Sequence, residues 1–231
     1  MGYRSYTACL FLLALTGLAR AQTTRPEGVV IEYSAPEVQT RTFDPKNLPP
    51  DMPPLRPGEA AVTESNFSCQ TVIAATIIDQ IPSAQGCTAT MRIASVRTTI
   101  KLGITIWLPV KGTKKLTAHE QGHRIIDERF YENAEAIARK LSEEMVGQRR
   151  VGRGPNCDAA AQIAIKQAAD QLCGDYMTAV QRPASRVQEL YDEITDHGRH
   201  PINEAVAIKR AMEQQKKEAE QAAATQPTAT P

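Results

Sequence analysis

The sequence predicts an α+β fold, with strands in the first half of the chain and helices in the second. Residues 67–109 are rich in β-branched residues, and residues 88–96 and 98–108 alternate between apolar and polar positions. After Thr113 the apolar residues recur at helical spacing instead. The chain has 231 residues, 42% of them hydrophobic, which suits one domain with a sizeable core. We therefore expect a small N-terminal β-sheet packed on a helical half.

Residues 1–21 have the pattern of a secretory signal peptide. Arg4 supplies the positive charge, residues 9–18 form a short apolar run, and Ala19 and Ala21 form a small-x-small cleavage site. The apolar run is about half as long as a membrane-spanning helix. The pattern predicts export to the periplasm or the cell exterior, with no stable membrane span after cleavage.

Residues 22–66 are expected to precede the main domain as a strand and a linker. Val29–Tyr33 has the composition of a strand. Seven of the fifteen prolines lie in residues 36–57, and a proline has no N–H to donate to a sheet. We predict that this stretch is extended, polyproline-like and outside the sheet. At the other end, residues 212–231 are predicted to form a charged helix followed by a disordered tail.

Export changes how the cysteines are interpreted. Cys9 leaves with the signal peptide, and the four that remain are Cys69, Cys87, Cys157 and Cys173. An even number of cysteines in an oxidising compartment predicts two disulfides. Three pairings are possible, and we favour the one that joins neighbours in sequence, Cys69–Cys87 and Cys157–Cys173. A zinc site built from cysteines is less favoured, because no C-x-x-C spacing occurs.

Three helices are predicted after the strands. The first begins after Thr113, and its apolar side chains fall on one narrow face. That face is formed by Leu116, His119, His123, Ile126, Phe130, Ala134, Ile137 and Leu141. Residues 147–154 hold three glycines and three arginines and are predicted to be a loop. A second helix is expected to end before Pro183, and a third to run from Ser185 to a left-handed cap at Gly198.

His119, Glu120 and His123 form the pattern H-E-x-x-H near the start of the first predicted helix. Two histidines four residues apart on a helix project side by side and can bind one zinc ion. Glu120 would lie beside such a metal, where a carboxylate can act as a general base towards zinc-bound water. The alternative is a helix with two solvated or partly buried histidines. The zinc site is favoured because the chain has only four histidines, in two close pairs.

A catalytic zinc keeps three protein ligands and one open position, so a third ligand is required. The metzincin pattern would need a histidine where this chain has Arg129, which excludes that subclass. His197 falls on the inward edge of the third predicted helix, whereas the helical wheel turns Asp192 away. We therefore favour His197 as the third ligand over Asp192, Glu193 and His200.

The HEQGH segment is followed about seventy residues later by Y-D-x-x-T-x-H-G at residues 191–198. Together the two motifs resemble a bacterial family of predicted secreted zinc-dependent proteases, long catalogued as a domain of unknown function. The likeness covers roughly residues 67–200. It implies a zincin-like metallopeptidase domain, which we assign to residues 67–211, with the second motif near one catalytic zinc. Tyr191 is a candidate donor to the substrate oxyanion, although a core position suits it at least as well.

We interpret the chain as a secreted or periplasmic zinc metallopeptidase that cleaves peptide bonds with a zinc-activated water and Glu120 as general base. Residues 98–108 could offer a strand edge to an extended peptide or protein substrate. The alternative is a non-catalytic exported zinc-binding or cell-envelope interaction protein on the same scaffold; hydrolysis of a non-peptide amide is a third interpretation. Because 27 basic side chains balance 26 acidic ones, nothing favours a nucleic-acid partner, and no oligomeric state is predicted.

Overall fold

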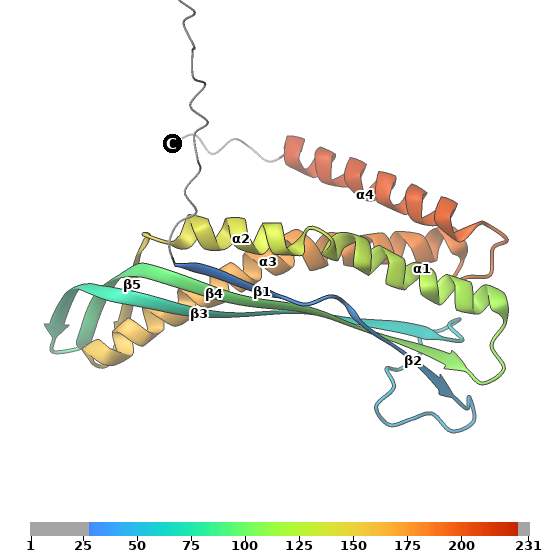
Figure 1. Ribbon diagram of the computed structural model, residues 1–231, viewed down its shortest axis with the longest axis horizontal. Coiled ribbons are helices and arrows are strands. Elements are labelled where there is room, and N and C mark those ends of the chain that lie inside the picture. The colour runs from blue at the N-terminus through green and yellow to red at the C-terminus, as the bar shows by residue number, and fades with distance from the viewer. Residues whose placement is uncertain (1–27, 226–231) are drawn as a thin grey trace, which may run out of the picture.

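The computed structural model describes residues 28–225 and has an α+β fold, a five-stranded sheet with three helices packed against it (Figure 1). The elements in chain order are β1 (Val29–Tyr33), β2 (Glu37–Phe43), β3 (Val62–Ser83), β4 (Gly86–Pro109), α1 (Lys114–Tyr131), α2 (Ala134–Met145), β5 (Arg149–Gly154), α3 (Cys157–Thr195) and α4 (Glu204–Thr225). The predicted fold class is confirmed, and so is the strand at Val29–Tyr33. The predicted signal peptide lies outside the described residues. Within residues 28–225, no helix combines the length and the apolar character needed to cross a membrane.

The sheet is organised around β4, which is paired on both sides. β3 runs antiparallel to it from one end to the other. On its opposite side β4 pairs in turn with β5, β1 and β2, three short strands placed one after another along it. The expectation that residues 98–108 offer a free edge is therefore wrong, because their backbone groups are already paired on both sides. The free edge of the described sheet at this position belongs to β3.

Alternation along β4 directs its apolar side chains towards the helices. Ile100, Leu102 and Ile104 are buried, whereas Arg97 and Lys101 are exposed on the opposite face. The helices cover one face of the sheet only, which is why the sequence has the two-residue period of a half-buried strand. The core between the sheet and the helices is completed from α3 and α1 by Tyr131, Tyr176, Val180 and Ala184.

The prediction that residues 36–57 lie outside the sheet is wrong for their first part. β2 pairs in parallel with residues 103–109 of β4. The reason is the placement of the prolines: Pro36 precedes the strand and Pro45 follows it, so no proline occupies a position within it. The remaining prolines of this stretch lie in the loop between β2 and β3.

The first predicted helix is divided in two. α1 ends at Tyr131, and α2 begins at Ala134 after Asn133, whose backbone is not helical. The predicted face nevertheless continues across the break, because Ile126 on α1 and Ala134 on α2 are both fully buried. The periodicity is set by burial against the sheet, which does not require an unbroken helix.

Residues 147–154 were predicted to be a loop, and this prediction is wrong, because they contain the strand β5. A Cβ atom on Gly152 would lie only 2.0 Å from the carbonyl oxygen of Ala160, and one on Gly154 only 2.7 Å from the amide nitrogen of the same residue. These glycines allow α3 to pass close to the strand. Close packing of backbones, rather than a turn, accounts for the glycines of this segment.

The second and third predicted helices form one helix, α3, of 39 residues with Pro183 in its interior. A proline inside a helix costs about 3 kcal/mol or more, because it removes a hydrogen bond and crowds the preceding turn. Here a fully buried stripe runs through both halves of the helix, and its packing offsets that cost. The stripe near the proline is formed by Leu172, Tyr176, Val180, Ala184 and Val187. α4 likewise begins at Glu204, before the predicted start at Met212, because its first turns pack on α1 and α3.

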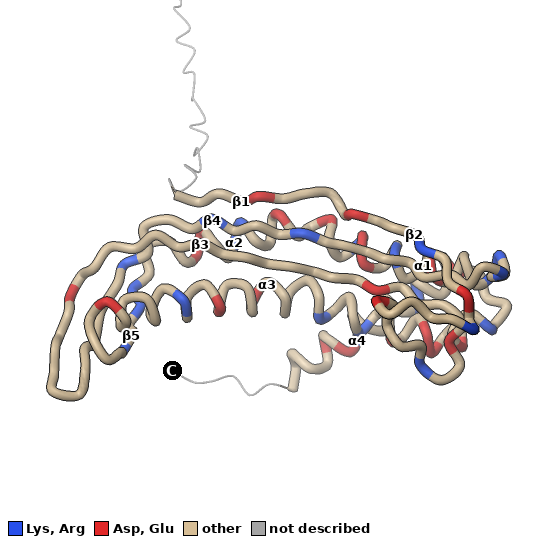
Figure 2. Tube along the Cα trace, turned by 90° about the horizontal axis from the view of Figure 1, so that it is seen from below, with Lys and Arg blue, Asp and Glu red and all other residues tan. Residues whose placement is uncertain are grey.

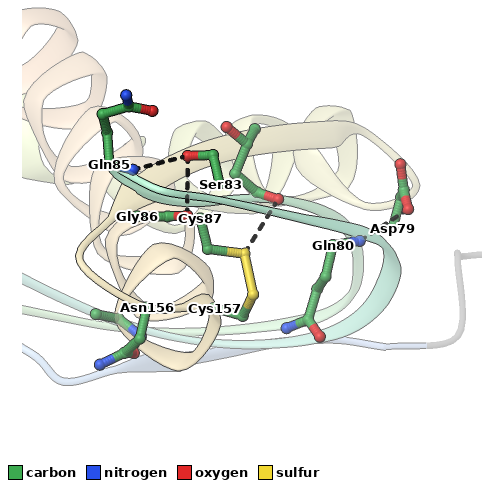
Figure 3. The surroundings of a disulfide bond; sticks show 10 residues. Asp79, Gln80, Ser83, Gln85, Gly86, Cys87, Asn156 and Cys157 are labelled. Atoms are coloured by element: carbon green, nitrogen blue, oxygen red, sulfur yellow. Dashed lines mark hydrogen bonds between the residues drawn. A yellow bond between two sulfur atoms is a disulfide. The ribbon is translucent and has the colours of Figure 1, made fainter.

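Two disulfides join α3 to the β3–β4 hairpin, Cys69–Cys173 and Cys87–Cys157. The predicted pairing of sequence neighbours is wrong. A helix rises about 1.5 Å per residue, so Cys157 and Cys173 are about 24 Å apart along α3 and cannot bond to each other. Figure 3 shows the Cys87–Cys157 bridge beside the tip of the hairpin and the start of α3, where Asn156 caps the helix. The bridges fit an oxidising compartment.

Candidate metal centre

The two sequence motifs meet between α1 and the last turns of α3. The Nε2 atoms of His119 and His123 are 3.2 Å apart. Asp192 Oδ1 lies 3.2 Å from the first of these nitrogens and 3.1 Å from the second. The three ligand atoms therefore form a nearly equilateral triangle, and all three side chains are largely buried.

This triangle has the dimensions of one face of a metal coordination shell. In a tetrahedral zinc site with bonds of about 2.0 Å, neighbouring ligand atoms lie about 3.3 Å apart. Two imidazole nitrogens and a carboxylate oxygen all present lone pairs, which repel one another unless a cation or a proton lies between them. Asp192 Oδ1 is buried and has no hydrogen-bond partner of normal geometry. The residues present thus fit a divalent cation such as Zn²⁺.

His197, the ligand favoured from the sequence, lies beside this triangle rather than in it. Its Nδ1 atom is 3.7 Å from Asp192 Oδ1, and it groups with Asp192 and Glu59 instead. The helical wheel misplaced Asp192 because it was centred on the apolar stripe. Glu193 and His200, the two remaining candidates for the third ligand, are exposed.

Polar side chains on α3 orient both histidine rings. Gln188 Oε1 is hydrogen-bonded to His123 Nδ1, and its Nε2 donates to the His123 carbonyl at 3.0 Å. This contact assigns the proton of a neutral His123 ring to Nδ1 and leaves Nε2 for a metal. Thr195 Oγ1 lies 3.5 Å from His119 Nδ1. Thr195 belongs to the Y-D-x-x-T-x-H-G motif, but sequence reasoning missed Gln188, although Gln188, Asp192 and Thr195 recur at i, i+4 and i+7 as a polar stripe.

The ring of Tyr191 supports His119 from the core side. The two rings stack at 5.0 Å between centroids, and the fully buried Tyr191 hydroxyl donates to the Glu204 carboxylate. A Cβ atom on Gly122 would lie 2.1 Å from the Tyr191 hydroxyl oxygen, and one on Gly198 would lie 2.8 Å from His119 Cγ. Both glycines are needed for these close approaches. Sequence reasoning missed Gly122 and Glu204, since neither has a local pattern that indicates such a role.

Glu120 lies beside the triangle and is only 3% exposed. Thr63, on β3, donates to Glu120 Oε2 at 2.7 Å and to its carbonyl oxygen at 3.1 Å. Burial raises the pKa of Glu120, although the nearby His123 opposes the shift. A raised pKa makes the carboxylate a stronger base. β3 therefore contributes to the site through Thr63, which had not been expected from the sequence.

Asp192 dominates the electrostatics of the triangle. Burial on its own would lower the pKa of His123, but the adjacent Asp192 carboxylate outweighs it and raises that pKa to about 9. Burial would also raise the pKa of Asp192, yet His119 and His123 hold it below its usual range. In the metal-free site the carboxylate thus keeps a proton on His123. A bound metal would displace that proton.

A pocket of about 530 Å³ opens over the triangle and Glu120. Its walls are the first residues of β3, the start of α1, residues 181–192 of α3 and the proline-containing loop that precedes β3. The cluster can therefore be reached by a small molecule or a chain segment through this pocket.

Comparison of the chain with protein-family models, with curated proteins and with solved structures finds no match. The site therefore rests on its own geometry: a possible His119–His123–Asp192 metal cluster with a buried carboxylate beside it.

Proposed function

We propose that the chain is an exported zinc-dependent metallopeptidase with His119, His123 and Asp192 as metal ligands. The observation that carries the proposal is the position of Glu120, whose buried carboxylate lies beside the ligand triangle at the wall of an open pocket. A purely structural metal site is normally closed by four protein ligands. This cluster has three and opens to a pocket, which supports a catalytic role.

Zn²⁺ bound at the triangle would polarise the scissile carbonyl and lower the pKa of a bound water to about 7. Glu120 accepts the proton of the attacking water and passes it to the leaving amine. Thr63 engages Glu120 Oε2, which leaves Oε1 for the water. Tyr191 is assigned a positioning role, because its hydroxyl is occupied by Glu204 and its ring supports His119.

The free edge of β3 is suited to an extended peptide substrate. Its first residues line the pocket, and Thr63 on the same strand holds Glu120. Exposed edges are usually protected by charged residues, yet β3 has none from Ser65 to Ile78. Figure 2 shows acidic residues only towards the two ends of β3. We propose that a substrate strand adds to this edge through backbone hydrogen bonds.

Export is proposed from two features that agree. The pattern of residues 1–21 is that of a secretory signal. The two disulfides close loops that span 104 and 70 residues, an arrangement typical of proteins in oxidising compartments.

The decisive experiment replaces the general base and leaves the ligands in place. Glu120→Gln is expected to retain zinc and to lose at least 100-fold in kcat on an unfolded protein or peptide library, because proton transfer contributes about 10²–10⁴-fold. Glu128→Gln is the matched control, since Glu128 lies two turns further along α1 and pairs with Arg124 at the surface. Full hydrolysis by zinc-loaded Glu120→Gln would exclude the mechanism. Zinc binding without any hydrolysis by the wild type would favour the non-catalytic function.

A further inference from the structure

A second group of possible metal ligands shares Asp192 with the first. Glu59, Asp192 and His197 each place one ligand atom within 4.8 Å of the others. His197 Nδ1 is 3.7 Å from Asp192 Oδ1. All three side chains line the pocket over the metal centre.

Two turns far apart in sequence bring Glu59 and His197 together. Gly58 has φ +93°, and a Cβ atom there would lie 3.3 Å from the Arg199 guanidinium. After α3, Asp196, His197 and Gly198 all have positive φ, at 49°, 51° and 77°. Left-handed backbone at a residue other than glycine is costly and persists where the surrounding structure requires it. These two turns therefore contact each other in a fixed arrangement that aims both side chains into the pocket.

Two buried polar atoms of this group lack partners. His197 Nδ1 is buried and accepts or donates no hydrogen bond, and Asp192 Oδ1 has none of normal geometry. The Glu59 carboxylate accepts a bond from the backbone N–H of Arg56 at 2.8 Å. Across the part of the chain that is described, no lysine or arginine pairs with Glu59. Because the His197 nitrogen is buried without a partner and two carboxylates lie close to it, a cation between these groups would satisfy all three.

Charge balance supports the same conclusion. One Zn²⁺ at the triangle would be offset by Asp192 and Glu120, and Glu59 adds a further negative charge to the same pocket, which Arg56 also lines. Two carboxylates and one imidazole form a ligand set that suits Zn²⁺ or Mn²⁺. A carboxylate between two cations about 3.5–4 Å apart is the usual arrangement in two-metal hydrolase sites.

We propose that Glu59, His197 and Asp192 bind a second divalent transition-metal cation, with Asp192 bridging it to the first. This inference rests on the proposed function only in that both cations share Asp192. The second site has fewer nitrogen ligands and greater exposure, so it binds zinc more weakly than the first.

Zinc stoichiometry tests the proposal. The full mature chain is titrated with Zn²⁺ alone, and bound zinc is counted by native mass spectrometry and elemental analysis. The wild type is expected to bind two zinc ions, and His197→Ala and Glu59→Gln one each. His119→Ala is expected to keep one, in the second site. His200→Ala is the matched control for His197→Ala, because His200 is exposed. Glu37→Gln, at an exposed carboxylate on β2, is the control for Glu59→Gln. Both control variants are expected to bind two zinc ions.

Every other count overturns the second site. One zinc in the wild type and one in both His197→Ala and Glu59→Gln leaves the proposed peptidase centre intact but rejects the second cation. One in the wild type and none in His197→Ala identifies His197 as a ligand of the first metal. No zinc in the wild type rejects the proposed function as well. Glu59→Gln, on a loop, keeps the test valid should His197→Ala disturb the turn.

Discussion

The two ends of the long β3–β4 hairpin are built from different side chains, although the same sheet and the same helix α3 extend through both. At the end near the metal centre, β3 presents hydroxyls to buried carboxylates, Thr63 to Glu120 and Ser65 to Asp127. At the far end the contact between β4 and α3 consists of small apolar side chains, such as Ala89 and Ala160, and a disulfide. One end is polar and costly to bury, and the other is apolar and covalently linked.

This difference separates stability from chemistry within one fold. Buried ionisable groups contribute little net stability and are costly when a partner is removed. The disulfides and the alanine-rich contact of α3 therefore supply stability away from the site, which allows the opposite end to keep charges in place for binding and catalysis. Substitutions at the two ends are therefore expected to change different properties, stability at the far end and zinc binding at the metal centre.

The largest effect is expected at the far end. Replacing Cys87 and Cys157 together by alanine removes a bridge that spans 70 residues, and the loop-entropy relation gives a loss of about 4 kcal/mol in the free energy of unfolding. The zinc dissociation constant is expected to stay within about 3-fold of wild type, because the metal centre lies at the other end of α3. Urea denaturation and zinc titration measure the two quantities. A parallel loss of zinc affinity would show that the two ends are not separable.

An intermediate effect is expected at the metal centre from Gly122→Ala. The added Cβ would overlap the Tyr191 hydroxyl, and overpacking of this kind costs about 1–3 kcal/mol. Zinc affinity should fall more than 10-fold, since Gly122 lies between the two histidine ligands. Gly174→Ala is the matched control: Gly174 is also helical but has open space around it, so stability should rise by about 0.5–1 kcal/mol.

Removal of the Tyr191 hydroxyl provides the complementary check on Gly122→Ala. Gly122→Ala combined with Tyr191→Phe is expected to recover only a small part of the lost zinc affinity, because the oxygen at 2.1 Å is gone but the ring carbon Cζ, at 2.6 Å, remains; Gly122→Ala combined with Tyr191→Leu, which removes the ring, should recover more. Equal affinity in the single variant and in the double variant with leucine would show that the overlap with the Tyr191 ring is not the cause.

The smallest effect is expected from Glu204→Gln at the start of α4. Its carboxylate binds both the Tyr191 hydroxyl and Lys115 Nζ, the latter at 2.5 Å. The amide keeps one hydrogen bond and loses the charge, so unfolding should become easier by about 1 kcal/mol. Glu220→Gln, in an exposed pair with Lys216 on the same helix, should leave both stability and zinc affinity unchanged. Differential scanning calorimetry distinguishes the two variants.

Features set by local pattern could be predicted from the sequence. The alternation around Ile100 and Leu102 reports burial of one face, and the four-residue spacing of His119 and His123 places both rings on one side of a helix. Both follow from distances of a few residues along the chain. For this reason the sequence was sufficient to predict the order of strands before helices and the candidate metal ligands on α1.

Features set by tertiary contact could not be predicted in this way. The pairing Cys69–Cys173 depends on how α3 lies along the hairpin, and the continuation of α3 through Pro183 depends on what its buried stripe contacts. The helical wheel placed Asp192 on the outward face, because it took the apolar residues as the only guide to the inward face. A helix with neighbours on two sides has two inward faces, and here one is apolar and the other polar.

The contact between Gly122 and Tyr191 limits which residues related proteins can have at these two positions. A related chain that keeps the tyrosine has room only for glycine at the position before the second histidine. A larger residue there requires a smaller one in place of Tyr191, so the two positions should change together among relatives. The effective signature of this metal centre is therefore H-E-x-G-H paired with Y-D, a narrower pattern than H-E-x-x-H alone.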